Sequence, residues 1–134
     1  MSLFDAINVA ATSLEAQSVR LNTVASNLAN ANAISSSEQA TYRAQYPVFE
    51  TMYNELTNAA GVRVSGVVQS DLPATREYAP THPMADDEGF IYRPNINSVE
   101  EMANMMEASR SYQNSIEAMN TAKQLILRTL TLGR

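Results

Sequence analysis

Helix-breaking residues are confined to the middle of this chain. All five prolines lie between residues 47 and 94, together with three of the four glycines, and the fourth glycine is Gly133. Proline and glycine both disfavour the interior of a helix. Residues 1–46 and 95–132 are therefore free to form long helices, and any turns and short strands must lie between them.

This distribution predicts a mainly α fold with a small β insert. Residues 1–34 and 95–134 are expected to form a discontinuous domain of long N- and C-terminal helices, packed as an antiparallel coiled-coil-like pair. Residues 35–94 are expected to form a loop plus a small β-rich insert. At 1.5 Å per residue, the two helices should be roughly 45–55 Å long, which leaves little else in a chain of 134 residues.

An apolar stripe runs along the N-terminal arm at alternating spacings of four and three residues. This is a heptad seam, interrupted by Gln17. The flanking residues are small, neutral and polar, whereas solvated helices usually carry Lys and Glu pairs. We therefore interpret the arm as surrounded by protein. Its predicted interface residues are Leu3, Ile7, Leu14, Leu21, Val24, Asn27, Leu28, Asn30 and Ala31.

The C-terminal arm carries a similar stripe. Asn97 or Ser98 can cap its helix, and the acidic residues of the first turn suit the helix dipole. Its methionines are compatible with a peptide-binding groove, but at helical spacing methionines more often pack between helices. The predicted interface residues of this arm are Met102, Met105, Arg110, Tyr112, Ile116, Met119, Ile126 and Leu130.

The insert is predicted to contain short strands separated by turns. Residues 42–49 and 62–68 alternate imperfectly, residues 75–79 are extended, and residues 90–92 form a last short strand. Two asparagines near the end of the first helix, Asn27 and Asn30, can hydrogen-bond neighbouring loops or backbone as an alternative to an interface role.

Composition excludes several classes of function. The chain has no cysteine, so disulfides, thiolate metal sites and a catalytic cysteine are excluded. Its 14 acidic and 9 basic residues give a net charge of −5, which argues against nucleic acid as a partner. No signal peptide or membrane-spanning run is visible. By itself this indicates a soluble, cytosolic protein without direct membrane insertion.

Few residues suggest chemistry. His82 is the single histidine and lies between two prolines without an evident nucleophile nearby. The acidic turn at residues 86–89 lacks the alternating oxygen ligands of a calcium loop. We therefore expect no catalytic residue, no cofactor-binding residue and no metal site, and a protein that is not an enzyme.

The two arms also contain recognisable signatures. Residues 25–31 (ASNLANA), together with PNIN from Pro94, Glu101-Met102 and ASRSY from Ala108, resemble the terminal signatures of bacterial flagellar rod and hook axial proteins. Shorter motifs along the whole chain are similar to those of proximal-rod members; these are Tyr42-Arg43, GVRV from Gly61, His82-Pro83, Glu88-Gly89-Phe90 and the ending LTLGR. The loop at residues 32–41 departs from the family pattern.

The resemblance implies a structural subunit of the flagellar basal-body rod. Such proteins join their terminal helices into an inner domain, stack into a hollow shaft that transmits torque, and surround the export channel. The implied partners are other rod subunits, copies of itself, the rod–ring adaptor FliE and the flagellar type III export apparatus. The implied location is the rod in the periplasmic space, reached without a cleaved signal peptide, which replaces the cytosolic interpretation. Alternatives are another axial protein of this family, a helical export chaperone, or an enzyme or peptide-binding module near His82 and Tyr92.

Overall fold

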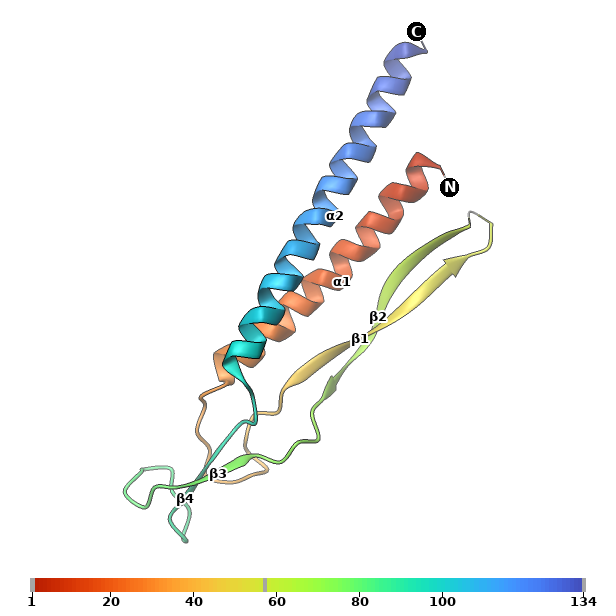
Figure 1. Ribbon diagram of the computed structural model, residues 1–134. Helices are drawn as coiled ribbons and strands as arrows, with labels where there is room; N and C mark the ends of the chain where they lie inside the picture. Colours follow the sequence, from red (N-terminus) through yellow and green to blue (C-terminus); the bar gives the residue numbers. More distant parts are fainter. Residues whose placement is uncertain (1, 57, 134) are drawn as a thin grey trace. The chain divides into compact units, whose positions relative to one another are not determined.

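The computed structural model describes residues 2–56 and 58–133. Within this part of the chain, two long helices flank four strands (Figure 1). The elements in chain order are α1 (Leu3–Asn30), β1 (Gln45–Asn54), β2 (Ala59–Gln69), β3 (Thr75–Tyr78), β4 (Phe90–Arg93) and α2 (Ser98–Leu132). The predicted mainly α fold with a small β insert is confirmed.

Side-chain caps fix where both helices begin. At α1, Ser2 Oγ accepts the Asp5 N–H at 3.2 Å, and the Asp5 carboxylate accepts the Ser2 N–H at 2.7 Å. These bonds from Ser2 lower the pKa of Asp5. At α2, Asn97 is the cap, because its Oδ1 accepts the Val99 N–H at 3.0 Å. The helices contain 28 and 35 residues, which corresponds to about 42 and 52 Å.

The strands form two separate two-stranded sheets, β1–β2 and β3–β4. β3 and β4 are antiparallel, with Thr75 opposite Arg93 and Tyr78 opposite Phe90, and Ser35 bridges to Tyr92 of β4. The last two strands match their predicted ranges closely. β1 and β2 are longer than predicted, and β1 begins at Gln45 instead of residue 42.

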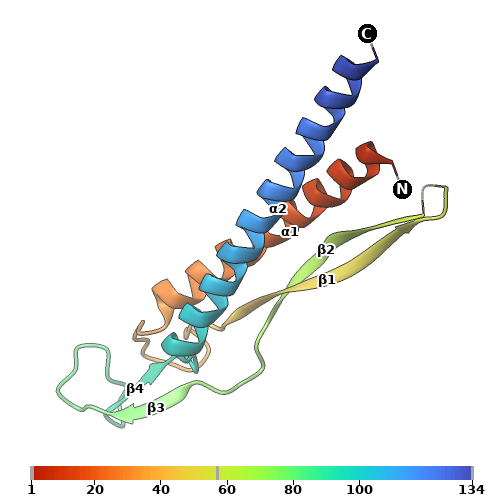
Figure 2. The same ribbon diagram turned by 45° about the horizontal axis from the view of Figure 1, so that its top comes forward.

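The chain divides into two compact units, each of which takes a part of both helices. The first unit contains Met1–Leu21, Pro47–Gly66 and Met106–Arg134, and the second contains Asn22–Tyr46 and Val67–Met105. Within each unit, a stretch of α1 lies beside an antiparallel stretch of α2, as both views of the ribbon show (Figures 1 and 2). The expected antiparallel pairing of the two helices is therefore confirmed within each unit.

The first unit buries only small side chains. Every buried side chain that is described in it is an alanine: Ala10, Ala16, Ala59, Ala108 and Ala122. The β1–β2 hairpin contacts α1 where the Val62 N–H donates to Thr12 Oγ1 at 3.3 Å. At the adjoining Gly61, a Cβ atom would lie 3.1 Å from the same oxygen. A side chain at Gly61 would therefore require Thr12 to shift by a few tenths of an ångström.

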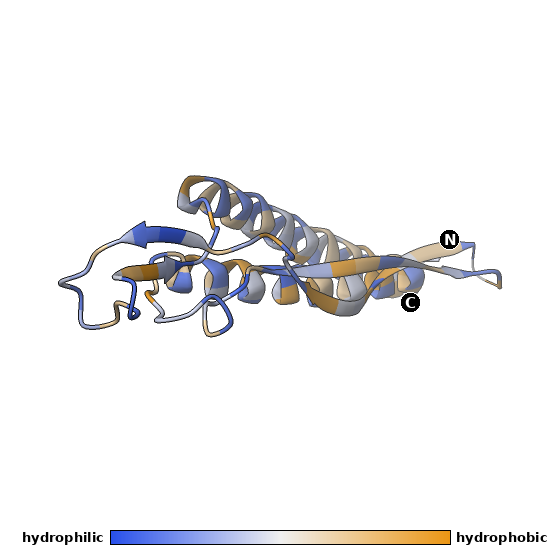
Figure 3. Ribbon diagram, turned by 90° about the horizontal axis from the view of Figure 1, so that it is seen from below, coloured by the Kyte–Doolittle hydropathy of each residue, from blue (hydrophilic) through white to orange (hydrophobic). Residues whose placement is uncertain are grey.

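The second unit buries larger and more polar side chains. Ile91 is 1% exposed and Asn27 is fully buried, and they are the two largest fully buried side chains described. Val24 of α1 and Glu101 of α2 are also buried here. Hydrophobic and hydrophilic residues are interspersed along the helices (Figure 3). The better-packed core of this protein therefore lies in the second unit.

Candidate assembly surface

Asn27 is the hub of a buried polar network in the second unit. Its amide Nδ2 donates to the Gln45 carbonyl at 2.9 Å and to Glu101 Oε2 at 3.1 Å. Its Oδ1 accepts the Gln45 N–H at 2.8 Å and the Tyr42 hydroxyl at 3.0 Å. The amide thus pairs with both backbone groups of Gln45 as a neighbouring strand would, so none of its four bonding positions is left to solvent.

This network ties three segments that are far apart in the sequence. It joins the end of α1 to the start of β1 and to the first turn of α2. The adjoining Arg43 Nη1 donates to the Ser70 carbonyl at 3.2 Å. Burial raises the pKa of Tyr42, and the nearby charge of Glu101 adds to the effect. Three of the motifs that suggested the family, ASNLANA, Tyr42-Arg43 and Glu101-Met102, therefore meet at one place.

Within the first unit, α1 and α2 are linked by polar contacts. The hydroxyls of Ser13 and Ser115 lie 2.9 Å apart, and Arg20 forms an ion pair with Glu107 at 3.2 Å. Sequence reasoning missed both pairs, because these four polar residues flank the predicted apolar stripes instead of interrupting them.

The predicted interface residues fall into three classes of exposure. Val24, Asn27 and Ala31 are buried within the chain. The half-buried residues are Ile7, Leu14, Leu21, Leu28, Asn30, Met105, Tyr112, Met119 and Ile126. The exposed residues are Leu3, Met102, Arg110, Ile116 and Leu130. Asn30 donates to the Ser26 carbonyl of its own helix at 2.8 Å, so its side chain caps no loop.

Large apolar side chains remain uncovered on α2. Ile116 is 38% exposed, Leu127 is 55% exposed and Leu130 is 65% exposed. Helical geometry places these three residues on one side of α2. The β1–β2 hairpin also exposes Phe49 and Tyr53, which the sequence analysis did not assign to a surface. Exposed apolar side chains arranged in this way are typical of a surface that another protein covers.

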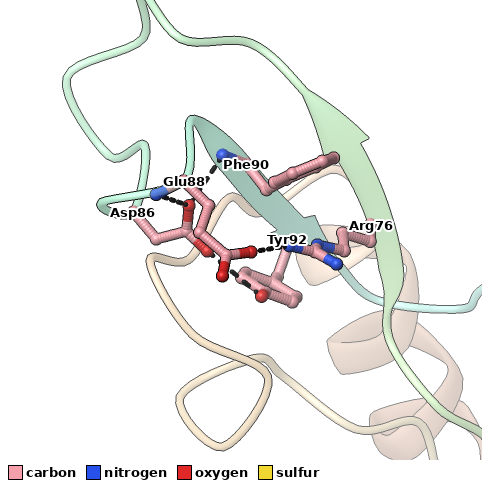
Figure 4. Close-up of polar contacts among 5 residues, drawn as sticks. All are labelled: Arg76, Asp86, Glu88, Phe90 and Tyr92. Carbon is pink, nitrogen blue, oxygen red and sulfur yellow. Dashed lines mark hydrogen bonds and ion pairs between the residues drawn. The ribbon is translucent and has the colours of Figure 1, made fainter.

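The acidic turn between β3 and β4 has a structural role (Figure 4). The Asp86 carboxylate accepts the backbone N–H groups of Glu88 at 3.0 Å and Phe90 at 2.8 Å, and the Tyr92 hydroxyl at 3.2 Å. Arg76 pairs with Glu88 and lies 3.6 Å from the centre of the Phe90 ring. These contacts close the loop and attach it to β3 and β4.

The same loop accounts for the other residues that had suggested chemistry. His82 Nδ1 accepts the Met84 N–H at 3.0 Å, so this nitrogen is already used in a turn. Gly89 has a φ of 84°, and a Cβ there would lie 3.1 Å from Tyr78 and from Pro80. Among the described residues, no group of three or more acidic, histidine or cysteine side chains could hold a metal ion.

The Asp86 bonds make the stability of this loop depend on pH. The Phe90 N–H, assisted by the Tyr92 hydroxyl and the Glu88 N–H, lowers the pKa of Asp86 below the ordinary value of 3.8. The carboxylate therefore stabilises the fold above pH 3.8, and this contribution is lost as the pH falls from 3.8 through the lowered pKa.

The substitution Asp86→Asn should remove this contribution to stability, and urea unfolding at a series of pH values measures the loss. The difference from wild type should be clear near neutral pH and should shrink as the pH falls below 3.8 through the lowered pKa. The neighbouring Asp87→Asn is the control, and an equal effect in it would contradict the assignment.

No helix in the described part of the chain has the length and apolar character needed to span a bilayer.

Comparison with known proteins identifies the family. Residues 7–33 match the family described as "Flagella basal body rod protein", and residues 87–132 match "Flagellar basal body rod FlgEFG protein C-terminal". The chain is 43% identical over 134 residues to the flagellar basal-body rod protein FlgC of Salmonella typhimurium, with 100% of both chains covered. The chain belongs to the FlgC family of flagellar basal-body rod proteins.

Other members of the FlgC family agree along the whole chain. The FlgC protein of Yersinia enterocolitica is 40% identical over 134 residues, and that of Bacillus subtilis is 31% identical over 150 residues. Both matches cover 100% of both chains. The resemblance predicted from the terminal signatures is thus confirmed, and this FlgC-family chain is a structural subunit of the flagellar basal-body rod.

Proposed function

We propose that the chain is a subunit of the proximal rod, where it assembles through its terminal helices into the hollow shaft that transmits torque and surrounds the export channel. In this proposal, residues 1–34 and 95–134 form the inner, helical domain. Residues 35–94 form the outer insert. The seventeen predicted interface residues contact neighbouring subunits or hold the contacting helices in place.

One observation carries this proposal: the first unit buries only alanines while large apolar side chains of α2 and the β1–β2 hairpin remain exposed. Burial of one large aliphatic or aromatic side chain contributes about 1.5–3 kcal/mol, and an alanine contributes much less. The first unit therefore gains its main apolar burial only when another protein covers these residues. A rod subunit meets such partners on every side.

The proposed partners are other rod subunits, further copies of the chain, the rod–ring adaptor FliE and the type III export apparatus. Export without a cleaved signal peptide would bring the subunit to the periplasmic part of the basal body. The absence of cysteine is compatible with this route, because a thiol-free chain forms no stray disulfide outside the cytoplasm. Arg110 is exposed on α2 and is proposed to pair with an acidic residue of a neighbour.

A non-enzymatic role follows from the same proposal. His82, which had been weighed as a catalytic residue, and the acidic turn, which had been weighed as a calcium loop, make hydrogen bonds that close a loop. A helical export chaperone is the second candidate, since a chaperone could also use the exposed apolar side of α2 to hold a client.

Purified basal bodies distinguish these functions. A rod subunit should remain in basal bodies that have been stripped of the hook and filament, and its deletion should abolish motility until the gene is restored. A chaperone should instead form a stable one-to-one complex in the cytoplasm and be absent from the particles. Absence of the chain from intact basal bodies would contradict the proposed function.

The difference in burial also predicts where the free subunit is cut by protease. The first unit should open readily, because its exposed apolar residues have no cover in the monomer. Limited proteolysis of the purified chain should therefore first remove residues up to about Leu21 and beyond about Met106, the boundaries of the units. The product should retain Asn27, Tyr42 and Glu101. Early cleavage between Val67 and Met105, with both chain ends protected, would contradict this order.

A further inference from the structure

The contacts between α1 and α2 alternate between small apolar residues and single polar pairs. Three polar pairs join the helices: Ser13 with Ser115, Arg20 with Glu107, and Asn27 with Glu101. Their α1 members are seven residues apart (20 − 13 and 27 − 20). Each heptad of α1 in this stretch therefore contributes one polar pair to the contact.

The fully buried apolar contacts of the first unit define only weakly how far one helix is displaced along the other. Ala108, Ser115 and Ala122 are seven residues apart on the side of α2 that is turned inwards, and both alanines are buried. If α2 moved by seven residues relative to α1, an alanine would replace Ser115 and the packing would change little. Large, fully buried interlocking side chains would resist such a shift, but the large apolar residues of the first unit, such as Leu14, Tyr112 and Met119, are at most half-buried in the part described.

The polar pairs do distinguish the observed register from a register that is shifted by seven residues. After a shift of seven residues, Ser13 would face Ala108 or Ala122, and its hydroxyl would lose its partner. Gln17 lies between the first two pairs, and its Oε1 is buried without a hydrogen-bond partner among the described residues. Polar groups on such a seam weaken the pairing, yet they select one alignment over its alternatives.

We propose that the register of the two terminal helices is set by these three polar pairs, and not by apolar packing. Ser13, Arg20 and Asn27 are then specificity-determining residues for the pairing of the arms. The proposal concerns the single chain and holds whether or not the rod is its final location. Its use in a polymer is that every subunit presents the same outer surface to its neighbours.

Disulfide trapping can read the register directly, because the chain has no cysteine of its own. The pair Ser13→Cys with Ser115→Cys reports the register of the structure, in which the two hydroxyls lie 2.9 Å apart. The pairs Ser13→Cys with Ala108→Cys, and Ser13→Cys with Ala122→Cys, report shifted registers. A seven-residue displacement is about 10 Å along a helix, so these pairs cannot form a disulfide in the observed register.

All three reporters remove the Ser13–Ser115 bond, so in them the Arg20–Glu107 and Asn27–Glu101 pairs must hold the register. In the purified full chain, the native pair should still form a disulfide, and the shifted pairs should form much less. Replacing the second polar pair by Arg20→Leu with Glu107→Leu should raise trapping in the shifted pairs about two- to fivefold, the effect of a partly exposed ion pair. The matched control is Arg110→Leu with Glu117→Leu, which removes the same two residue types from the exposed side of α2 and should leave trapping unchanged.

A charge swap tests the same pair without adding apolar residues. Arg20→Glu alone should increase shifted trapping, and Arg20→Glu combined with Glu107→Arg should restore the native pattern. Circular dichroism of each variant establishes that the helices have formed. If shifted trapping stays at its original level in all variants, or rises equally in the control, packing or the connecting insert sets the register and the inference is wrong.

Discussion

Replacing Ile116 by aspartate is expected to abolish rod assembly and motility while leaving the free subunit folded. Ile116 is 38% exposed on α2, so a carboxylate at this position remains hydrated in the monomer. When a neighbouring subunit covers this side of the helix, the charge must be buried without a partner, which costs several kcal/mol. A cell that depends on this variant should show no swimming in soft agar and no hooks on isolated basal bodies.

A matched variant separates this effect from a general effect of added charge. Asn114→Asp introduces the same charge two residues earlier, and helical geometry places it on nearly the opposite side of α2. It should assemble much better than Ile116→Asp. Normal motility of the Ile116→Asp strain would show that this side of α2 faces solvent in the rod, and the predicted interface would then be wrong at this position.

Replacing Asn27 by alanine is expected to produce the largest loss of stability in the free subunit. The change leaves the Tyr42 hydroxyl, both backbone groups of Gln45 and the buried Glu101 carboxylate without their shared partner. Each unsatisfied buried group costs about 1–3 kcal/mol, so we expect a total loss of about 3–5 kcal/mol. Urea unfolding measures this loss. It is monitored by the near-ultraviolet circular dichroism of the tyrosines, since the chain has no tryptophan.

Asn30→Ala is the matched control for this prediction. It removes the same side chain three residues later, where the amide donates only to the Ser26 carbonyl of its own helix. The expected loss is about 0.5 kcal/mol or less. Similar losses in the two variants would show that Asn27 acts through helix propensity, and the network would then have little energetic weight.

The sequence predicted both helices and their antiparallel pairing, for a clear physical reason. Helix breakers are absent from both arms, and Asn97 caps α2 as one of the two residues expected there. β1 and β2 were predicted too short because their exposed residues do not alternate between polar and apolar. Exposed apolar residues are adjacent in both strands, as Val48 and Phe49 are in β1 and Val67 and Val68 are in β2, and this removes the signal for the strand limits.

The polar network at Asn27 could be predicted only in part. Its position near the end of a helix indicated a possible bond to backbone, and the structure shows that this bond is to Gln45. The contributions of Tyr42 and Glu101 depend on how the chain folds back on itself, which no local pattern encodes. The predicted interface residues are a similar case: the stripe identified the helix sides, but Val24 and Ala31 are buried within the subunit.

The pair of hydrogen bonds between the Asn27 amide and Gln45 has a mechanical consequence. The two bonds, of 2.9 and 2.8 Å, join the same side chain to one backbone residue in opposite directions. Because both bonds share one side chain and one backbone residue, a force that pulls Gln45 away from Asn27 acts on both bonds. The start of β1 can therefore leave the end of α1 only when both bonds are broken, so the two segments are expected to separate in a single step.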